Sequence, residues 1–443
     1  MENLGISLVG VIALFVLLAV GVHIGFALMI SGFVGLFLLR HEIAPVMNMI
    51  VSAFYHKVTM PVLITLPLFI IMGFLASGGG ISQDIYRSLS LWVGRFKSGL
   101  GIATVLACTA FGTVCGSSLV TAAVFTKISA PEMRRNGYEK KLAYGICASA
   151  GAIGMLIPPS MLAVVYGILS GESIGKLLMA GVAPGLLLTV GFSVAIVLIG
   201  MVRPDSMRVA EMPTVSWGAR FRSLKDWWSV TIVAGCIFGG LYGGVFSPSE
   251  AAAVAAFALF VIYILMMLLG KHRQEKVKEL RGIFFETAVT SAMVFLVLGS
   301  ATVFSSFITM SGLTKFMVQV IVDSQASPFS IVLIIVGFIL ILGCFLDSTS
   351  ILCITIPIFN PIIRTLGVDP IWYATVIIMA VEIGLITPPF GMNVFATKGV
   401  AESDVKMEEI FSGVLPFLVV MLLVLVFLLA FPAVSTFLPS MVE

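Results

Sequence analysis

Long, uninterrupted apolar stretches recur along the whole chain, and each can cross a lipid bilayer as a helix, which takes about 20 residues. Ten stretches of this kind lie near 4–22, 23–39, 60–77, 143–171, 177–200, 229–246, 250–270, 284–310, 371–397 and 412–432. Their apolar residues are continuous and do not alternate with polar ones, which is typical of helices and not of β-barrel strands. The pattern predicts an all-α polytopic membrane protein with about ten full transmembrane helices.

Two further apolar segments, 99–130 and 328–360, are interrupted near the middle by small polar residues. The sequence Gly-Ser-Ser at 116–118 interrupts the first segment, and Asp-Ser-Thr-Ser at 347–350 interrupts the second. Non-helical backbone at membrane depth is tolerated only where it is buried in protein or lines a cavity. We therefore predict two re-entrant helical hairpins, each of which enters and leaves the membrane on one side.

An internal repeat relates the two halves of the chain. A shift of 230 residues carries Gly154 onto Gly384 and Pro158 onto Pro388. The same shift pairs Ser117 with Asp347, Ser118 with Ser348, Pro131 with Pro361, Gly137 with Gly367, Ile153 with Ile383, and Pro159 with Pro389. Glycine and proline are common in membrane helices, but coincidences at one offset favour a repeat over chance. Matched interruptions in two halves indicate the substrate and ion site of a secondary transporter.

Each half reads as a span, a short amphipathic arm, a broken hairpin, a span broken by Pro-Pro, and a final span. The predicted units are N-terminal scaffold helices at 1–59, repeat 1 at 60–200, a connecting loop with two scaffold helices at 201–283, repeat 2 at 284–432, and a C-terminal tail at 433–443. The predicted arms are 81–96 and 313–323.

The composition narrows the class of protein further. Charged residues make up 11% of the 443 residues, against about 25% in ordinary soluble domains. This excludes a soluble enzyme, a disordered chain and a nucleic-acid-binding protein, and leaves the lipid bilayer as a necessary partner. The six cysteines show no CxxC spacing and the four histidines are scattered, so no metal cluster is expected. Neither a Walker A motif nor a known catalytic motif occurs, so we predict no enzyme activity and no ATP-driven transport.

The distribution of lysine and arginine predicts the orientation. Most of these residues lie in the segments 87–97, 127–141, 203–225, 271–281 and 398–406. The positive-inside rule places these segments in the cytoplasm. Ten crossings then put both termini in the periplasm, and the spans that precede the two hairpins run in opposite directions. The repeats are therefore predicted to have inverted topology, with the first hairpin entering from the cytoplasm.

The interruptions supply the kind of ligands that a hard cation prefers. Hydroxyls and unwound backbone carbonyls can bind Na⁺ without burying much fixed charge. The two prolines of each break remove backbone donors, which frees carbonyls about one turn earlier, near Gly154 and Gly384. Thr387 adds a hydroxyl in the second half. We predict one Na⁺ site in each repeat, held between a hairpin tip and a broken helix. The alternative is that these hydroxyls bond to their own helix carbonyls and only pack.

Two acidic residues lie deep in the apolar segments. Asp347 stands at the second hairpin interruption, and an ionisable group at membrane depth is costly enough to indicate function. Glu382 precedes Gly384 by two residues and could bind a cation, relay a proton, or be a neutral structural acid. The positive ends of half-helices at the tips and breaks favour an anionic substrate. The predicted substrate contacts are Ser118, Thr121, Thr349 and Asn393.

With these motifs in place, nearly the whole chain resembles the large membrane subunit of a TRAP (tripartite ATP-independent periplasmic) transporter. The motifs that carry the resemblance are Ser77-Gly78-Gly79-Gly80-Ile81, Gly116-Ser117-Ser118, Gly137-Tyr138, Ile157-Pro158-Pro159-Ser160, Phe246-Ser247-Pro248-Ser249-Glu250-Ala251-Ala252, Asp347-Ser348-Thr349, and Glu382-Ile383-Gly384-Leu385-Ile386-Thr387-Pro388-Pro389. Together they are highly specific, whereas each alone is weak. One departure is Cys115, where a small serine is more usual.

The resemblance implies a Na⁺-coupled elevator transporter in the bacterial inner membrane that imports small organic anions, mostly carboxylates and sometimes sulfonates. It implies two or more co-transported Na⁺ ions, a periplasmic substrate-binding protein, and a small four-helix membrane subunit. Because the sequence begins at the first span of the large subunit, that small subunit is expected to be a separate polypeptide. The implied Na⁺ ligands are Gly116, Ser117, Ser118 and the Gly154–Pro158 break in one half, with Asp347, Ser348, Thr349 and the Gly384–Pro388 break in the other.

Two alternatives stay open from the sequence. A stand-alone Na⁺/dicarboxylate symporter would share the hairpins and breaks but would need no binding protein. A channel or an intramembrane hydrolase would use Asp347 and Glu382, although their 35-residue separation matches no recognised catalytic pair.

Overall fold

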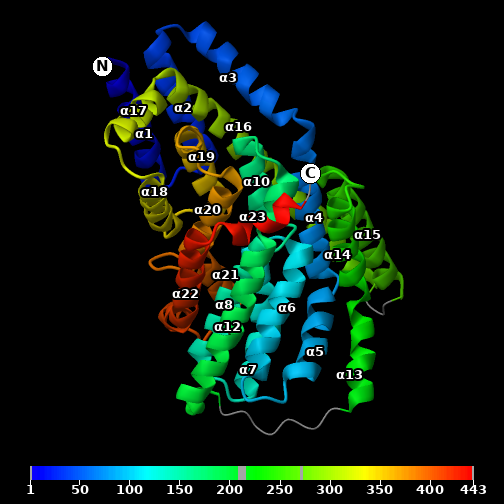
Figure 1. The fold of residues 1–443 in the computed structure, drawn as a ribbon. Helices are drawn as coiled ribbons and strands as arrows, with labels where there is room; N and C mark the ends of the chain where they lie inside the picture. The colour runs from blue at the N-terminus through cyan, green and yellow to red at the C-terminus, as the bar shows by residue number, and fades with distance from the viewer. Residues whose placement is uncertain (1, 208–215, 270–272, 442–443) are drawn as a thin grey trace.

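The computed structural model of the chain describes residues 2–207, 216–269 and 273–441, which form helices joined by turns and short loops (Figure 1). No strand occurs in these three ranges; a single bridge joins Tyr138 and Met207. The chain therefore has the all-helical fold that the apolar pattern predicts. Parts of the predicted connecting segment (208–215 and 270–272) and the last two residues of the predicted tail lie outside the described residues.

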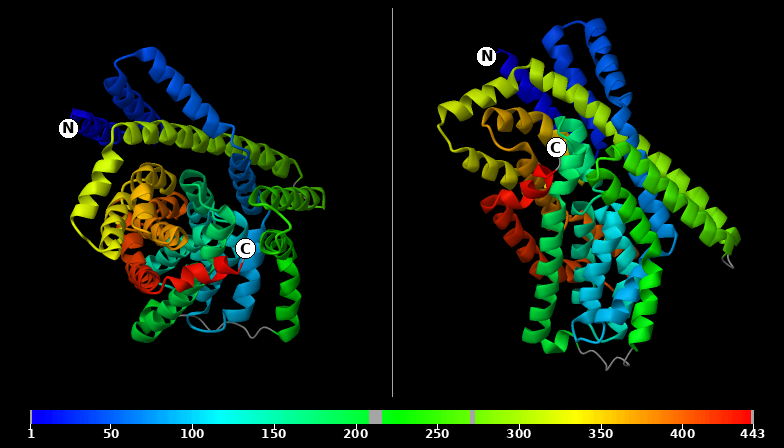
Figure 2. Two further views of the ribbon diagram at one scale, coloured as in Figure 1. Left: turned by 45° about the horizontal axis from the view of Figure 1, so that its top comes forward. Right: turned by 45° about the vertical axis from the view of Figure 1, so that its right-hand side comes forward.

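The N-terminal helices pack against one long helix. They are α1 (Glu2–Ala19), α2 (Ile24–Arg40) and α3 (Ile43–Val58), and their partner is α16 (Arg273–Met310), which has 38 residues. Figure 2 shows α16 running alongside α1–α3 at the edge of the molecule, next to a compact bundle of the remaining helices. Small residues permit the close approach: a Cβ on Gly32 would lie 3.0 Å from the backbone nitrogen of Phe304.

Helices from the first half follow the predicted order. They are η1 (Pro61–Ile64), α4 (Thr65–Gly78), α5 (Ile81–Val93), α6 (Gly99–Cys115), α7 (Ser118–Arg135), α8 (Lys140–Gly151), α9 (Ile153–Leu156), α10 (Met161–Ser170), α11 (Ile174–Ala180) and α12 (Val182–Val202). The arm α5 has an apolar and a polar face, and it ends at Val93, before Gly94. Helices α6 and α7 pack on each other as a pair joined by a two-residue turn.

The connecting segment contains η2 (Pro204–Ser206), α13 (Trp217–Ser223), η3 (Leu224–Trp227), α14 (Trp228–Tyr242) and α15 (Pro248–Leu269). The second half contains α17 (Leu313–Asp323), α18 (Pro328–Gly343), α19 (Ser348–Thr365), α20 (Pro370–Gly384), α21 (Met392–Val400), α22 (Met407–Ala430) and α23 (Ala433–Ser440). The arm α17 has the bounds that the sequence predicts. Helix α10 of the first half packs against α19 of the second, so the halves form one bundle.

Three helical features differ from the sequence prediction. Helix α3 is an additional helix between predicted spans, and α23 lies in the predicted tail. Helix α16 begins at Arg273, so the predicted boundary at 283/284 falls inside it. The reason is that hydropathy marks only the apolar part of a helix, whereas the Arg-, Glu-, Lys- and Leu-rich residues at 273–281 are good helix formers that continue it.

Length and composition identify membrane-spanning candidates among the described residues. Five helices are long and apolar enough to cross a membrane, and the bent pair 140–156 and 161–170 makes a sixth. Five apolar helices are shorter, including those at 99–115 and 328–343. The multi-pass, all-helical class is thereby supported, while the count of ten full crossings and the inverted arrangement stay predictions.

An ion-pair cluster ties the end of α7 to the loop before α22. Arg134 contacts Glu402 and donates to Asp404 Oδ2 at 3.0 Å, and Lys140 lies 3.1 Å from the same oxygen. The hydrogen bond from Lys140, together with Arg134, holds the pKa of Asp404 below its ordinary value. A lowered pKa means that the carboxylate stabilises the fold above about pH 4 and loses this effect as the pH falls through its lowered folded value.

We therefore expect Asp404→Asn to lower the melting temperature of the purified protein at neutral pH by about 1–2 °C, because exposed ion pairs contribute little. The difference from the wild type should shrink as the pH falls towards about 3 and as salt is added. Glu408→Gln is the matched control, since Glu408 makes no ion pair in the described structure and lies at the same helix end. A pH-independent deficit in Asp404→Asn would contradict the ion-pair explanation.

Candidate functional site

The tip of the first hairpin is a turn between α6 and α7. Gly116 follows α6 with a left-handed φ of 65°, and Ser117 caps α7 by accepting a hydrogen bond from the Val120 N–H at 3.5 Å. Only glycine fits at 116, because a Cβ would overlap the carbonyl oxygen of Pro159. The Gly116 carbonyl in turn accepts the N–H of Met161 at 3.3 Å. The first tip is therefore seated directly on the Pro-Pro break of the same half.

The tip of the second hairpin lies between α18 and α19. Asp347 caps α19: its carboxylate accepts the Ser350 N–H at 3.1 Å and also the Ser350 hydroxyl. Ser348 is buried and Thr349 is half-buried at the start of the helix. Asp347 occupies the place that Ser117 has in the first half, as the predicted repeat requires, and it brings a negative charge that the first tip lacks.

The broken helices interrupt at the predicted prolines. Helix α9 ends at Leu156 and α10 begins at Met161, with a bend of 44° between the segments. Helix α20 ends at Gly384 and α21 begins at Met392. Both Pro-Pro peptide bonds are cis. The first break is buried, whereas Pro388 and Pro389 are exposed, so the two breaks have different surroundings.

In each half, the broken helix touches the first hairpin helix through glycine. A Cβ on Gly112 would lie 2.7 Å from the Cα of Gly154, and one on Gly343 would lie 2.6 Å from the Cα of Gly384. The two glycine pairs therefore occupy corresponding places in the two halves. The sequence predicts Gly154 and Gly384 as sources of free carbonyls, and the structure adds that both are points of backbone contact.

The two tips line one cavity of about 390 Å³. Its polar lining from the tips consists of Ser117 in the first half and Asp347, Ser348, Thr349 and Ser350 in the second. Helices α4 and α16 close the other side with residues such as Gly73, Thr290 and Val297. Chain segments more than 200 residues apart therefore meet where the repeat predicts a shared site.

The remaining predicted residues lie beside the cavity and not in its lining. Thr121 donates to the Ser117 carbonyl at 2.7 Å, and Thr387 donates to the Ile383 carbonyl at 2.7 Å, as hydroxyls in helices often do. Asn393 is fully buried, and its side-chain amide has no hydrogen-bond partner in the described residues. Such an orphaned buried amide is costly unless a ligand or a rearrangement satisfies it.

A single contact joins the polar centres of the two halves. The Ser118 hydroxyl on α7 donates to Glu382 Oε1 on α20 at 3.4 Å, and both side chains are fully buried. The second carboxylate oxygen of Glu382 has no partner in the described residues. Ser118 thus faces the acid of the other half, a pairing that the sequence offset alone could not indicate.

His23 is a cavity residue that the sequence reasoning missed. It caps α2 in the turn after α1, its Nδ1 accepts the Gly25 N–H at 3.3 Å, and its side chain lines the cavity. It is the only lining residue that can carry a positive charge. A lone histidine between apolar stretches gives no signal in the sequence, since only the packing of the α1–α2 turn against α4 and α16 brings it to the tips.

Apolar helices, two capped tips at one cavity and a Pro-broken helix behind each tip define a membrane transporter of the secondary class. The chain belongs to the family described as the tripartite ATP-independent periplasmic transporter, DctM component, whose family model matches residues 11–434. This confirms the resemblance to TRAP large subunits. The family consists of transporter permeases and not of enzymes.

Individual relatives cover most of the chain. The large permease protein of a C4-dicarboxylate TRAP transporter from Pseudomonas aeruginosa is 34% identical over 85% of this chain and 86% of its own length. That of an ectoine/5-hydroxyectoine TRAP transporter from Ruegeria pomeroyi is 31% identical over 96% and 97%. Among solved structures, the YdaH transporter of Alcanivorax borkumensis shares the fold, with a TM-score of 0.59 and 14% identity over 88% of this chain and 90% of that one.

Proposed function

We propose that this chain is the translocating large subunit of a Na⁺-coupled, binding-protein-dependent transporter that imports a small organic anion across the bacterial inner membrane. The observation that carries the proposal is the single cavity lined by both hairpin tips, with Asp347 in its wall. Family membership supports the transport role and the tripartite assembly. The Na⁺ coupling and the anionic cargo are inferred from the chemistry of the tips.

Two Na⁺ sites are proposed, one in each half. The first uses Gly116, Ser117 and Ser118 with the Gly154–Pro158 break, and the second uses Asp347, Ser348 and Thr349 with Gly384, Thr387 and Pro388. Seating of the first tip on its break through Gly116 and Met161 supports the pairing of tip with break. The half-buried carboxylate of Asp347 supports a cation in the second half, because a charge there needs a partner.

A small anion is proposed to bind between the tips, with Thr349 in the cavity wall and Ser118, Thr121 and Asn393 behind it. The cavity volume of about 390 Å³ lies within the range of about 300–1,000 Å³ for small-molecule sites. His23 supports an anionic cargo, since its imidazole is the only lining group able to become cationic. The relatives above are named for C4-dicarboxylates and for ectoine, so the similarity does not select one cargo.

The proposed assembly contains a small four-helix membrane subunit and a periplasmic binding protein, as the tripartite family description supports. Within the chain, we propose that the hairpins and broken helices move as an elevator against a scaffold that includes α1–α3 and α16. The separation of α16 and its neighbours from the compact bundle in Figure 2 supports this division. Both termini are proposed to face the periplasm, with the repeats inverted across the membrane.

Reconstitution tests the proposal directly. The binding protein encoded beside the gene is first screened by thermal shift against a panel of organic anions, and the anion that stabilises it serves as the radiolabelled substrate. Proteoliposomes containing both membrane subunits should accumulate this substrate only with an inward Na⁺ gradient and added binding protein. Equal uptake in K⁺ would refute the coupling, and equal uptake of free substrate alone would favour the stand-alone symporter.

A further inference from the structure

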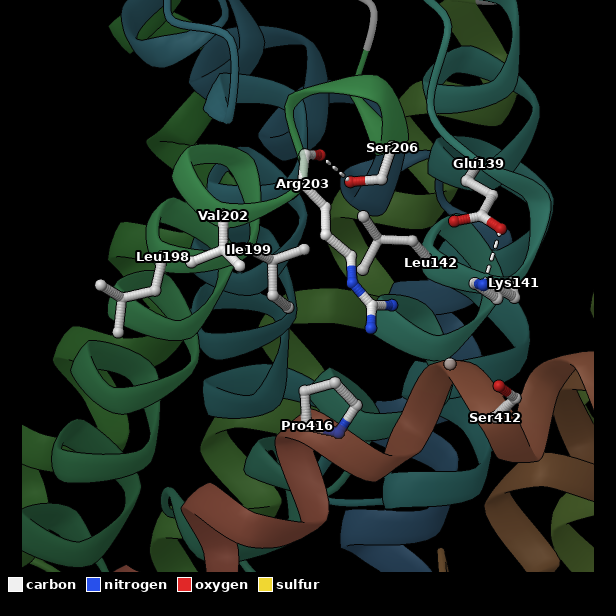
Figure 3. A pocket seen from close by; sticks show the side chains of 11 residues that line it. Glu139, Lys141, Leu142, Leu198, Ile199, Val202, Arg203, Ser206, Ser412 and Pro416 are labelled. Atoms are coloured by element: carbon white, nitrogen blue, oxygen red, sulfur yellow. Dashed lines mark hydrogen bonds and ion pairs between the residues drawn. The ribbon is translucent and has the colours of Figure 1, made fainter.

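A groove on the outer surface of the bundle lies far along the helices from the hairpin tips. It has a volume of about 320 Å³ and is formed where the ends of α8 and α12 meet the first turns of α22. Helices α8 and α22 touch through Gly145 and Gly413, and the groove opens beside this contact. Figure 3 shows its lining: apolar side chains of Leu142, Ile199 and Pro416 surround one guanidinium group.

The guanidinium belongs to Arg203, the residue that ends α12. Its side chain points into the groove and makes no hydrogen bond or ion pair within the described residues, although its backbone carbonyl accepts the Ser206 hydroxyl (Figure 3). The other two charges of the lining neutralise each other, because Lys141 lies 2.8 Å from Glu139. The groove therefore has a net positive charge that only Arg203 supplies.

The surroundings of the groove are apolar and exposed. On α12, Leu198 is 53% exposed and Val202 is 78% exposed, and on α22 the side chains of Leu415 and Val419 are also exposed. In a membrane protein such faces are covered by acyl chains. A cationic group at the end of such a face meets the level of lipid headgroups, and basic pockets between membrane helices bind anionic headgroups.

We propose that this groove binds one anionic phospholipid, whose phosphodiester pairs with the Arg203 guanidinium while an acyl chain lies along α12 and α22. Arginine suits this role because its planar donors match phosphate oxygens and because it sheds water more easily than lysine. The site is distinct from the cavity between the tips, and it shares no lining residue with it.

Native mass spectrometry of the full-length protein, purified in detergent and titrated with phosphatidylglycerol, tests the site. The wild type should bind phosphatidylglycerol in preference to phosphatidylcholine, and Arg203→Gln should bind it about tenfold more weakly, as expected for the loss of one charge-assisted hydrogen-bonded pair. Arg222→Gln is the matched control, since it removes the same charge from an exposed position on α13 outside the groove. Without added lipid, Arg203→Gln should melt like the wild type.

Three results would overturn the proposal. Equal binding of phosphatidylglycerol by wild type and Arg203→Gln would remove Arg203 from the site. Equal stabilisation by inorganic phosphate and by phosphatidylglycerol would show a simple anion site without an acyl chain. Loss of the small membrane subunit from the purified complex in Arg203→Gln, with lipid binding unchanged, would show that the groove is a protein interface.

Discussion

Replacing Asp347 with asparagine is expected to raise the Na⁺ concentration for half-maximal uptake by at least about tenfold. Asparagine keeps the shape and an oxygen ligand but removes the negative charge, and a charge a few ångströms from a cation contributes several kcal/mol even at an effective dielectric constant near 20. The carboxylate is half-buried in the cavity wall, so solvent screens it only partly. Na⁺-dependent uptake into proteoliposomes over a range of Na⁺ concentrations measures the shift.

The matched control is Asp369→Asn. Asp369 caps α20 as Asp347 caps α19, since its Oδ1 accepts the N–H groups of Ile371 at 2.9 Å and Trp372 at 2.8 Å, but it does not line the cavity. Asparagine is as good a cap as aspartate, so both variants should fold. If Asp347→Asn and Asp369→Asn both retain the wild-type Na⁺ dependence, Asp347 is only a helix cap.

The second large effect is expected for Gly116→Ala, which should abolish uptake and destabilise the protein by roughly 2–5 kcal/mol. The added methyl group would overlap the Pro159 carbonyl oxygen, and it would also force an alanine into the left-handed region. The first tip could then no longer sit on its break. A lowered melting temperature together with lost uptake is the expected measurement.

Gly367→Ala separates the steric effect from the backbone effect. Gly367 has the same φ of 65°, but a Cβ there would meet no atom within 4 Å. This variant should therefore lose only about 1–2 kcal/mol of stability, the cost of the left-handed conformation, and should keep its uptake. Similar losses in both variants would show that close seating of the first tip has no special importance.

The sequence predicts those features that depend on local chemistry. The helix interruptions at 116–117 and 347 follow from small polar residues in apolar surroundings, and the breaks at 158–159 and 388–389 follow from proline. The arm at 313–323 follows from its amphipathic period. The repeat offset also indicates correctly that equivalent glycines face equivalent helices.

Features that depend on contacts between distant segments were not predicted. His23 reaches the cavity because the α1–α2 turn packs against α4 and α16, and no residue near it in the sequence indicates this. The Ser118–Glu382 contact crosses from one half to the other, whereas the repeat pairs each residue only with its own equivalent. Arg203 gains its place in a groove from helices that begin about 60 residues before it and 200 residues after it.

The glycine contacts limit how an ion can leave its site. Because Gly112 touches Gly154, and Gly343 touches Gly384, backbone to backbone, no side chain lies between the two helices that could swing aside like a gate. Parting them would expose backbone along the whole contact, which is costly where water is absent. Na⁺ should therefore exit along the cavity-lining faces of the tips, with each hairpin and its broken helix travelling together as one rigid piece.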